Sequence, residues 1–333
     1  MADFTNVTFS DKNCSVTAVP LRAAYPVVQW KLTLYTVTFV VSMLGNSFMF
    51  LLITTDRQLR TPFNTYVVCL AVSNIINNIA KPFEIVNAWK GVAWAWSETA
   101  CSLYMYIGWV QLSTLYNLHQ VIACVRMWAV IHPQSYRTRN KQTLAVGLCV
   151  GVWVYAHLAR LPFWILDTAY YRASIIQNGG SCSANTAKQQ LYVAISQGIL
   201  FFIPLIVLIM VTPVVFCARI AQSKKIAARL PVVPVVSGPT SGRGPKQPQR
   251  GLFLLGLLSL LAILCWLPNS CFFLMLMIDP GFATTVVPPS VSKVIVAMNI
   301  VPSSIDPIIF ILSVENLRQA VCRLPTRLRR VRL

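Results

Sequence analysis

The sequence predicts an all-α membrane protein, a bundle of seven transmembrane helices with a short amphipathic eighth helix. Three observations support this prediction. The 333 residues are 56% hydrophobic and only 11% charged, whereas a soluble domain carries about 25% charged residues. Seven apolar segments come close to the roughly 20 residues that a helix needs to cross a bilayer. Basic residues gather in every second segment between these runs.

The third apolar segment illustrates the argument. No Asp, Glu, Lys or Arg occurs between Glu98 and Arg126, and a helix over this run is about 40 Å long at ~1.5 Å per residue. The fourth segment extends past Arg160, and the seventh is interrupted by Lys293 and Asp306. The uncharged runs are residues 32–55, 61–80, 99–125, 142–159, 189–218, 251–278 and 294–305.

The loop charges predict the orientation. With the N-terminus outside the cell, the cytoplasmic segments contain 19 Lys and Arg residues, and the outer segments contain far fewer. Such an excess is typical of cytoplasmic loops. The net charge of +19 therefore reflects orientation and attraction to anionic lipid, and nucleic acid is not an expected partner.

Residues 1–27 are expected to be a short extracellular segment without a fold of its own. Its two N-glycosylation sequons begin at Asn6 and Asn13, which agrees with an outer N-terminus. No cleavable signal peptide is apparent, so the first span is expected to direct membrane insertion. The remaining parts are a bundle over residues 28–312, with a flexible Pro/Gly-rich third inner loop at about 222–249, and a basic cytoplasmic tail over 313–333.

Two groups of cysteines have predicted roles. Cys101 begins the third span and Cys182 lies in the outer loop after the fourth, so both are on the oxidising side and a disulfide is predicted. Cys14 has no obvious outer partner. Cys322, in the basic tail, is either a palmitoylation site or a free interfacial thiol.

The second span is unusually polar. Asn74, Asn77, Asn78, Lys81 and Glu84 recur at spacings of three and four, which places them roughly on one helix face. Intramembrane polar groups face the bundle interior or a wet cavity. Lys81 and Glu84 are spaced to pair with each other.

Landmarks in successive spans resemble those of rhodopsin-like (class A) G-protein-coupled receptors over about residues 30–323. The second span reads Leu-Ala-Val-Ser-Asn at 70–74, similar to the family's LAxAD, and Trp94 to Cys101 resembles WxFGxxxC. Further matches are Gly45-Asn46, the stretch from Arg126 through Pro133 to Tyr136, Trp153, Pro204, the CWLP sequence at 265–268, and Asp306-Pro307 through Phe310.

The departures from the family pattern concern the activation switch. Val125 and Met127 flank Arg126 where the family has an acidic residue and a tyrosine, and Pro248 replaces a second acidic partner. Phe310 lacks the hydroxyl of the family's tyrosine. The resemblance therefore implies an intact scaffold with an altered switch, whose residues are Asn74, Arg126, Pro133, Tyr136, Asp306, Pro307 and Phe310.

Two departures come as pairs. Asn74 and Asp306 reverse the family's Asp and Asn, which is either a functional exchange or independent drift; whether sodium binds is left open. The second pair is an exchange of volume. Ala262 is small where the family has a phenylalanine, and Tyr116 supplies a large side chain instead.

The resemblance implies a ligand pocket that opens outward between the helices. Gly108 stands where amine receptors have an aspartate, and Ile300 replaces the lysine that binds retinal, so neither an amine nor a retinal cofactor is expected. A neutral, aromatic-lined pocket beside Lys81 and Glu84 suits a peptide or a neutral small molecule. Its candidate residues, each with core packing as the alternative, are Glu84, Tyr104, Gly108, Trp109, Leu112, Ser196, Gln197, Trp266, Asn269, Ser270, Phe273, Val296 and Ile300.

The sequence contains no motif for catalysis or metal binding. His119, His132 and His157 are expected to have structural roles, so an enzyme is not expected. The resemblance implies a plasma-membrane receptor that binds an extracellular ligand and couples to a heterotrimeric G protein. The alternative is a seven-helix protein that binds or scavenges a ligand with weak or no coupling, and arrestin is an uncertain partner because only Ser313 and Thr326 follow the seventh span as phosphorylatable hydroxyls.

Overall fold

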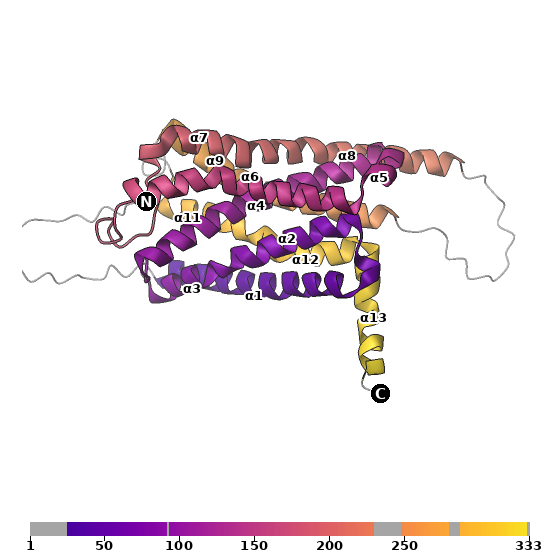
Figure 1. Cartoon of the computed structure of the whole chain (residues 1–333), viewed down its shortest axis with the longest axis horizontal. Helices are drawn as coiled ribbons and strands as arrows, with labels where there is room; N and C mark the ends of the chain where they lie inside the picture. Colours follow the sequence, from indigo (N-terminus) through magenta and orange to yellow (C-terminus); the bar gives the residue numbers. More distant parts are fainter. Residues whose placement is uncertain (1–24, 92, 230–247, 280–286, 332–333) are drawn as a thin grey trace, which may run out of the picture.

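The computed structural model describes residues 25–91, 93–229, 248–279 and 287–331. In these residues the chain forms helices that pack side by side into one elongated bundle (Figure 1). In chain order the elements are α1 (Tyr25–Thr55), η1 (Arg57–Leu59), α2 (Pro62–Ile79), α3 (Lys81–Lys90), α4 (Glu98–Ile131), α5 (Pro133–Arg139), α6 (Gln142–Leu166), η2 (Asp167–Tyr171), η3 (Ala187–Gln189), α7 (Gln190–Gln197), η4 (Gly198–Phe202), α8 (Ile203–Arg229), α9 (Pro248–Ile278), α11 (Pro289–Ala297), η5 (Met298–Ile300), α12 (Val301–Ser313) and α13 (Glu315–Val331).

Several of these elements are parts of one span. α2 and α3 follow each other, as do α6 and η2, then α7, η4 and α8, and finally α11, η5 and α12. The π-helical turns η2 and η4 and the internal prolines interrupt regular hydrogen bonding, which bends long helices. The seven predicted spans therefore all have a helical counterpart in the bundle.

Six helical segments are long and apolar enough to cross a membrane, counted over the described ranges. The seventh member of the bundle, α4, is as long but carries many polar side chains, including Gln111, Ser113, Thr114 and Asn117. These side chains are buried, because α4 packs against α2, α6 and α8 in the centre of the bundle. A central helix meets little lipid, so it does not need a wholly apolar surface.

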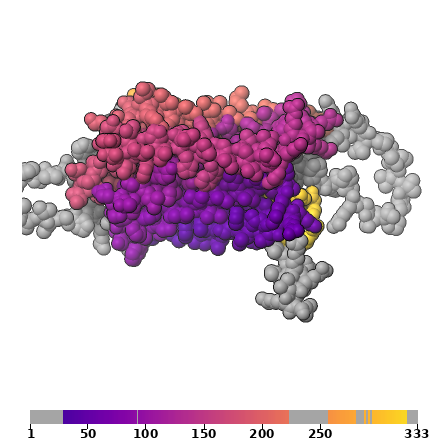
Figure 2. Space-filling view, viewed as in Figure 1, coloured from indigo at the N-terminus to yellow at the C-terminus, as the bar shows by residue number. Residues whose placement is uncertain are grey.

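The outer surface of the bundle is apolar. Leu44, Leu51, Leu158 and Met210 are each more than half exposed, as 57–69% of their surface is accessible. Figure 2 shows that the segments from α1 to α8 form a closed, continuous surface on the side in view. An apolar belt with internally bonded helices is what a bilayer requires.

The contact between α1 and α12 explains the Gly45-Asn46 landmark. A Cβ atom on Gly45 would lie 2.6 Å from Cγ of Pro307, so only glycine allows this approach. Asn46 donates from Nδ2 to the carbonyl oxygen of Ser303 at 2.9 Å, and Ser42 donates from Oγ to the same oxygen at 3.0 Å. That carbonyl belongs to the turn before Pro307, where proline cannot donate.

The eighth helix, α13, begins at one end of the bundle, turns roughly perpendicular to the long helices and extends past the edge of the bundle (Figure 1). Leu317 is fully buried against the core that includes α1 and α12, and Cys322 is exposed. The ends of the predicted flexible loop at 222–249 are helical, because α8 runs to Arg229 and α9 begins at Pro248. The glycosylation positions Asn6 and Asn13 lie outside the described residues.

Candidate functional site

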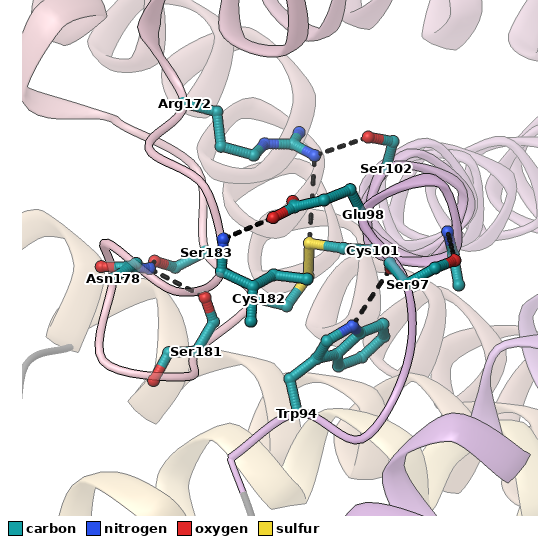
Figure 3. Close-up of a disulfide and its surroundings, with 12 residues drawn as sticks. Trp94, Ser97, Glu98, Cys101, Ser102, Arg172, Asn178, Ser181, Cys182 and Ser183 are labelled. Atoms are coloured by element: carbon teal, nitrogen blue, oxygen red, sulfur yellow. Dashed lines mark hydrogen bonds between the residues drawn. A yellow bond between two sulfur atoms is a disulfide. The ribbon is translucent and has the colours of Figure 1, made fainter. Parts of the chain in front are cut away.

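The disulfide lies at the end of the bundle opposite α13 and is drawn with its surroundings in Figure 3. Cys101 in the first turn of α4 is bonded to Cys182, with a Cα–Cα distance of 5.7 Å, so the predicted disulfide is present. Beside it, Arg172 pairs with Asp167 at 2.6 Å and donates to Oγ of Ser102 at 2.9 Å. The loop after α6 is thereby fixed to α4 at two neighbouring points.

A cavity of about 220 Å³ lies between the helices on this side of the bundle. Its walls come from α1, α2, α3, α4, α6, α7, η4, α9, α11 and η5. Of the residues predicted to form the pocket, the cavity is lined by Glu84, Tyr104, Gly108, Trp109, Leu112, Gln197, Asn269, Ser270, Phe273, Val296 and Ile300.

Two predicted pocket residues, Ser196 and Trp266, do not line the cavity. Trp266 is 1% exposed and stacks face to face on Tyr116, with ring centroids 3.9 Å apart. It therefore lies beneath the cavity, one helical turn below Asn269 and Ser270. Ser196 turns toward α6 and accepts a hydrogen bond from Arg160 at 3.0 Å.

The cavity is also lined by Asn77 and Lys81, from the polar face predicted for the second span. Five further lining residues were not predicted, namely Tyr35, Arg160, Phe201, Phe202 and Asn299. Arg160 matters most, since it adds a positive charge to a pocket interpreted as neutral. The available signal was its position inside the fourth apolar run, because an intramembrane charge is by default a functional candidate.

The acidic group of the cavity already has partners. Oε1 of Glu84 accepts from the hydroxyl of Tyr104 at 2.7 Å and pairs with Nζ of Lys81 at 3.3 Å. The predicted Lys81–Glu84 pair is therefore confirmed. A cationic ligand would have to displace Lys81 to reach this carboxylate.

A second polar cluster lies deeper in the bundle, around Asp306 of α12. Its Oδ2 accepts from Nδ2 of Asn74 at 2.9 Å, and its Oδ1 lies 3.2 Å from Nε2 of His119. Asn74 also donates to Oδ1 of Asn46 at 3.1 Å. The exchanged residues Asn74 and Asp306 thus face each other, and His119 is a third member that the sequence interpretation treated only as structural.

The geometry of this cluster fixes its proton count. Nδ1 of His119 lies 2.9 Å from the carbonyl oxygen of Leu115, which can only accept, so Nδ1 carries a hydrogen. Nε2 then faces a carboxyl oxygen of Asp306, and a hydrogen bond there needs one proton between them. Asp306 and His119 therefore form either an ion pair or a neutral pair that shares a single proton.

The volume exchange at Tyr116 and Ala262 also has a structural basis. Both residues are buried in one apolar cluster with Trp266, where Tyr116 stacks on the indole. The ring of His119 packs perpendicular to the same indole, with ring centroids 4.9 Å apart. Trp266, which lies one helical turn below the cavity, therefore contacts His119, and His119 in turn contacts Asp306 in the polar cluster.

Arg126 lies at the α13 end of the bundle. Its guanidinium carbon lies 3.4 Å from the centre of the Phe63 ring, and its Nε is buried without a hydrogen-bond partner. Within the ranges that the structure describes, it forms no ion pair. Pro133 begins α5, and Tyr136 packs edge-on against Trp128, with ring centroids 5.5 Å apart.

The remaining switch position, Phe310, is fully buried in the core. In the described part of the chain, no group of three or more His, Cys, Asp or Glu residues is arranged to hold a metal ion.

Comparison with known proteins identifies a single family. The family described as "7 transmembrane receptor (rhodopsin family)" matches residues 45–310. A C-X-C chemokine receptor type 1 from Rattus norvegicus is 31% identical over 43% of this chain and 40% of its own length. A type-1 angiotensin II receptor B from Xenopus laevis is 25% identical over 53% of this chain and 49% of its own. A proteinase-activated receptor 3 from Bos taurus is 29% identical over 53% of this chain and 48% of its own. The chain thus covers less than half the length of each of these three relatives.

Proposed function

The chain belongs to the rhodopsin family of seven-transmembrane receptors, and on this basis we propose that it binds an extracellular ligand in the 220 Å³ cavity and signals through a heterotrimeric G protein. The family is a class of receptors rather than enzymes. The proposed location is the plasma membrane, with residues 1–27 outside the cell and residues 313–333 in the cytoplasm.

One observation supports signalling rather than binding alone. The cavity wall at Asn269 and Ser270 lies one turn above Trp266, which contacts His119, which in turn contacts Asp306. A ligand that moves this part of α9 would change the packing around the polar cluster. Such a ligand shifts the population toward whichever helix arrangement it binds better.

The orientation is supported by the charges at the two ends of the bundle. Arg137, Arg139 and Lys141 lie at the α13 end, whereas the disulfide lies at the other end, as an oxidising compartment requires. Epitope tags at the two termini of the chain in intact cells test this proposal. Access of antibody to both tags would refute it.

The ligand class follows in part from the cavity. Gly108 offers no charge, and the carboxylate of Glu84 is occupied by Lys81 and Tyr104. This supports the part of the expectation that disfavours an amine, whereas the charge of Arg160 speaks against the neutral small molecule that the sequence suggested.

The altered switch supports a specific resting behaviour. Arg126 has no carboxylate partner among the described residues and rests on Phe63. In relatives that follow the family pattern, such a partner would hold the arginine in the resting state. We therefore expect measurable signalling without ligand.

A nucleotide-exchange assay tests coupling. The purified protein in lipid nanodiscs is incubated with each of the main heterotrimeric G-protein classes, without ligand. We expect nucleotide exchange faster than with empty nanodiscs. This exchange should be lost in Arg126→Ala and kept in Arg137→Ala, a control variant at an exposed position. Exchange no faster than in empty nanodiscs, with every class of G protein, would favour the scavenging alternative.

The proposed contacts at the membrane and with arrestin follow from α13. Its basic amphipathic sequence suits the lipid surface, and exposed Cys322 is accessible for palmitoylation. Ser313 is buried and donates to the carbonyl oxygen of Ile309, so it is a poor kinase substrate. Phosphorylation-dependent arrestin recruitment is therefore expected to be weak.

A further inference from the structure

Arg160 is the one strongly buried cation of the cavity that has no acidic partner among the residues that the structure describes. It lies on α6, is 1% exposed, and lines the cavity. Nη1 donates to Oγ of Ser196 at 3.0 Å, but Nε and Nη2 are buried without any hydrogen-bond partner.

The surroundings hold the guanidinium in place without neutralising it. Its central carbon lies 5.0 Å from the ring centres of both Trp109 and Phe201, so two aromatic rings flank it. Cation–π contacts of this kind attract the charge but leave the N–H groups free. The side chain is therefore positioned and pre-ordered, with two nitrogen donors that are unused but covered, so a ligand reaches them only when a neighbouring side chain moves aside.

A buried charge of this kind needs compensation. Arginine does not lose its proton in proteins, and an isolated charge in a low-dielectric interior is strongly destabilising unless it is paired. The acidic residue that lines the cavity, Glu84, is already bonded to Lys81 and Tyr104. The counter-charge must therefore come from something that enters the cavity.

We propose, building on the receptor function proposed above, that the cavity binds a ligand through a single carboxylate that pairs with Arg160. The planar guanidinium fork matches the two oxygens of a carboxylate. Lys81 and Glu84 cancel each other, so the cavity carries one net positive charge, which fits a monoanion better than a doubly charged phosphate. The rest of the ligand lies against Leu112, Phe273 and the neighbouring apolar wall.

Further polar groups are available beside the carboxylate site. The Oγ atom of Ser270 and the Oδ1 atom of Asn269 are buried next to the hydroxyl of Tyr116 but form no hydrogen bond of normal geometry, and both residues line the cavity. They suit a polar group elsewhere on the ligand. Through these residues of α9, the bound ligand also reaches the turn above Trp266.

The carboxylate belongs either to a small organic acid or to the C-terminus of a short peptide. Both sources are tested by thermal-shift binding on the purified full-length protein in detergent, which requires no G protein. One arm compares 3-phenylpropionate, indole-3-propionate and decanoate with their primary amides. The other arm compares short apolar tripeptides that end in a free carboxylate with the same peptides amidated.

The expected result is that acids in at least one arm raise the melting temperature more than their amides do. Arg160→Gln should weaken binding of the best acid roughly 10- to 100-fold, the loss expected for hydrogen bonds to a charged group, and should leave amide binding unchanged. Arg160→Lys keeps the positive charge but loses the planar guanidinium group, so its affinity for the acid should lie between those of the wild type and Arg160→Gln. The matched control Lys90→Gln removes an exposed charge outside the cavity and should bind like the wild type.

The stability of the empty protein separates a binding role from a structural one. If Arg160 serves ligand binding, its buried charge has no counter-charge in the empty protein. Arg160→Gln should therefore melt at the same temperature as the wild type or at a higher one. A clear loss of stability in Arg160→Gln would indicate a structural role and overturn the proposal. The proposal would also be overturned if acids and amides changed the melting temperature equally in both arms, or if neither changed it.

Failure of this proposal differs from failure of the receptor function. An acid preference that depends on Arg160, without nucleotide exchange, would refute coupling and leave the carboxylate site standing. Nucleotide exchange that depends on Arg126, with no preference for acids over amides, would refute the carboxylate site and leave G-protein coupling standing.

Discussion

Replacing His119 by leucine is expected to be one of the most destabilising single changes within the bundle. The side chain is 3% exposed, and Asp306, its partner, is fully buried. Loss of the imidazole removes the donor to Oδ1 and leaves a buried carboxylate with only Asn74 as a bonded partner. Breaking a buried ion pair from one side costs about 3–5 kcal/mol.

Because a single proton lies between His119 and Asp306, a second substitution should rescue the first. In the double variant His119→Leu with Asp306→Asn, no charge needs compensation, and the new amide can still accept from Asn74. The cost should fall to about 1–2 kcal/mol, that of one unsatisfied buried donor. Asp306→Asn alone should be mild, because a neutral His119 can accept at Nε2 from the new amide while its Nδ1 still donates to Leu115.

Melting temperatures of the purified protein in detergent measure these effects. At about 2–4 °C per kcal/mol, the single variant should melt roughly 6–20 °C lower than the wild type. As a control, His157→Leu removes a part-buried bond to Tyr106 of 2.7 Å and should cost about 1 kcal/mol. A His119→Leu protein as stable as the wild type would refute the reasoning. So would a double variant that is less stable than His119→Leu.

Four further predictions concern other parts of the chain. Cys101→Ser should abolish surface expression or ligand binding, and normal expression with unchanged binding would contradict a structural role for the disulfide. Gly45→Val should sharply lower folded yield, because its Cβ would lie 2.6 Å from Pro307; a normal yield would show that the helices can separate. Sodium chloride and potassium chloride at equal strength should give the same melting temperature, because both oxygens of Asp306 already have protein partners, and stabilisation by sodium alone would contradict this. Ser313→Ala should leave ligand-stimulated arrestin recruitment unchanged, since this hydroxyl is buried, and a measurable drop would refute that view.

The bundle was predictable because lipid imposes a simple rule on composition. Each segment that crosses the apolar core has to be long and nearly uncharged, and this can be counted in the sequence. α4 was recognisable, despite its polar side chains, because no charged residue occurs between Glu98 and Arg126. The disulfide followed from the position of two cysteines on the oxidising side.

The cavity was predictable in its lining but not in its charge. Helical spacing shows which residues share a face, and most of the predicted residues do line the cavity. The depth of a residue along that face depends on how neighbouring helices pack, which is why Trp266 lies below the cavity and Ser196 beside it. Arg160 was not predicted because it lies on the fourth span, which the resemblance does not include among the walls of the pocket.

The His119–Asp306 pair could not be derived from the sequence alone. The two residues are 187 positions apart, and they meet only because α4 and α12 pack at one particular register. Exchange of Asn74 and Asp306 suggested that these two lie close together, and the structure supports that. Nothing in the sequence indicated that an imidazole would complete the group.

The single proton held between His119 and Asp306 restricts how this protein can change over evolutionary time. Replacing His119 alone leaves the carboxylate of Asp306 without its partner, and replacing Asp306 alone by any residue other than asparagine leaves His119 without its hydrogen bond. Descendants should therefore alter positions 74, 119 and 306 in concert, and co-varying positions of this kind are a signature of contact in space. A family tree of close homologues would show these three sites mutating on the same branches.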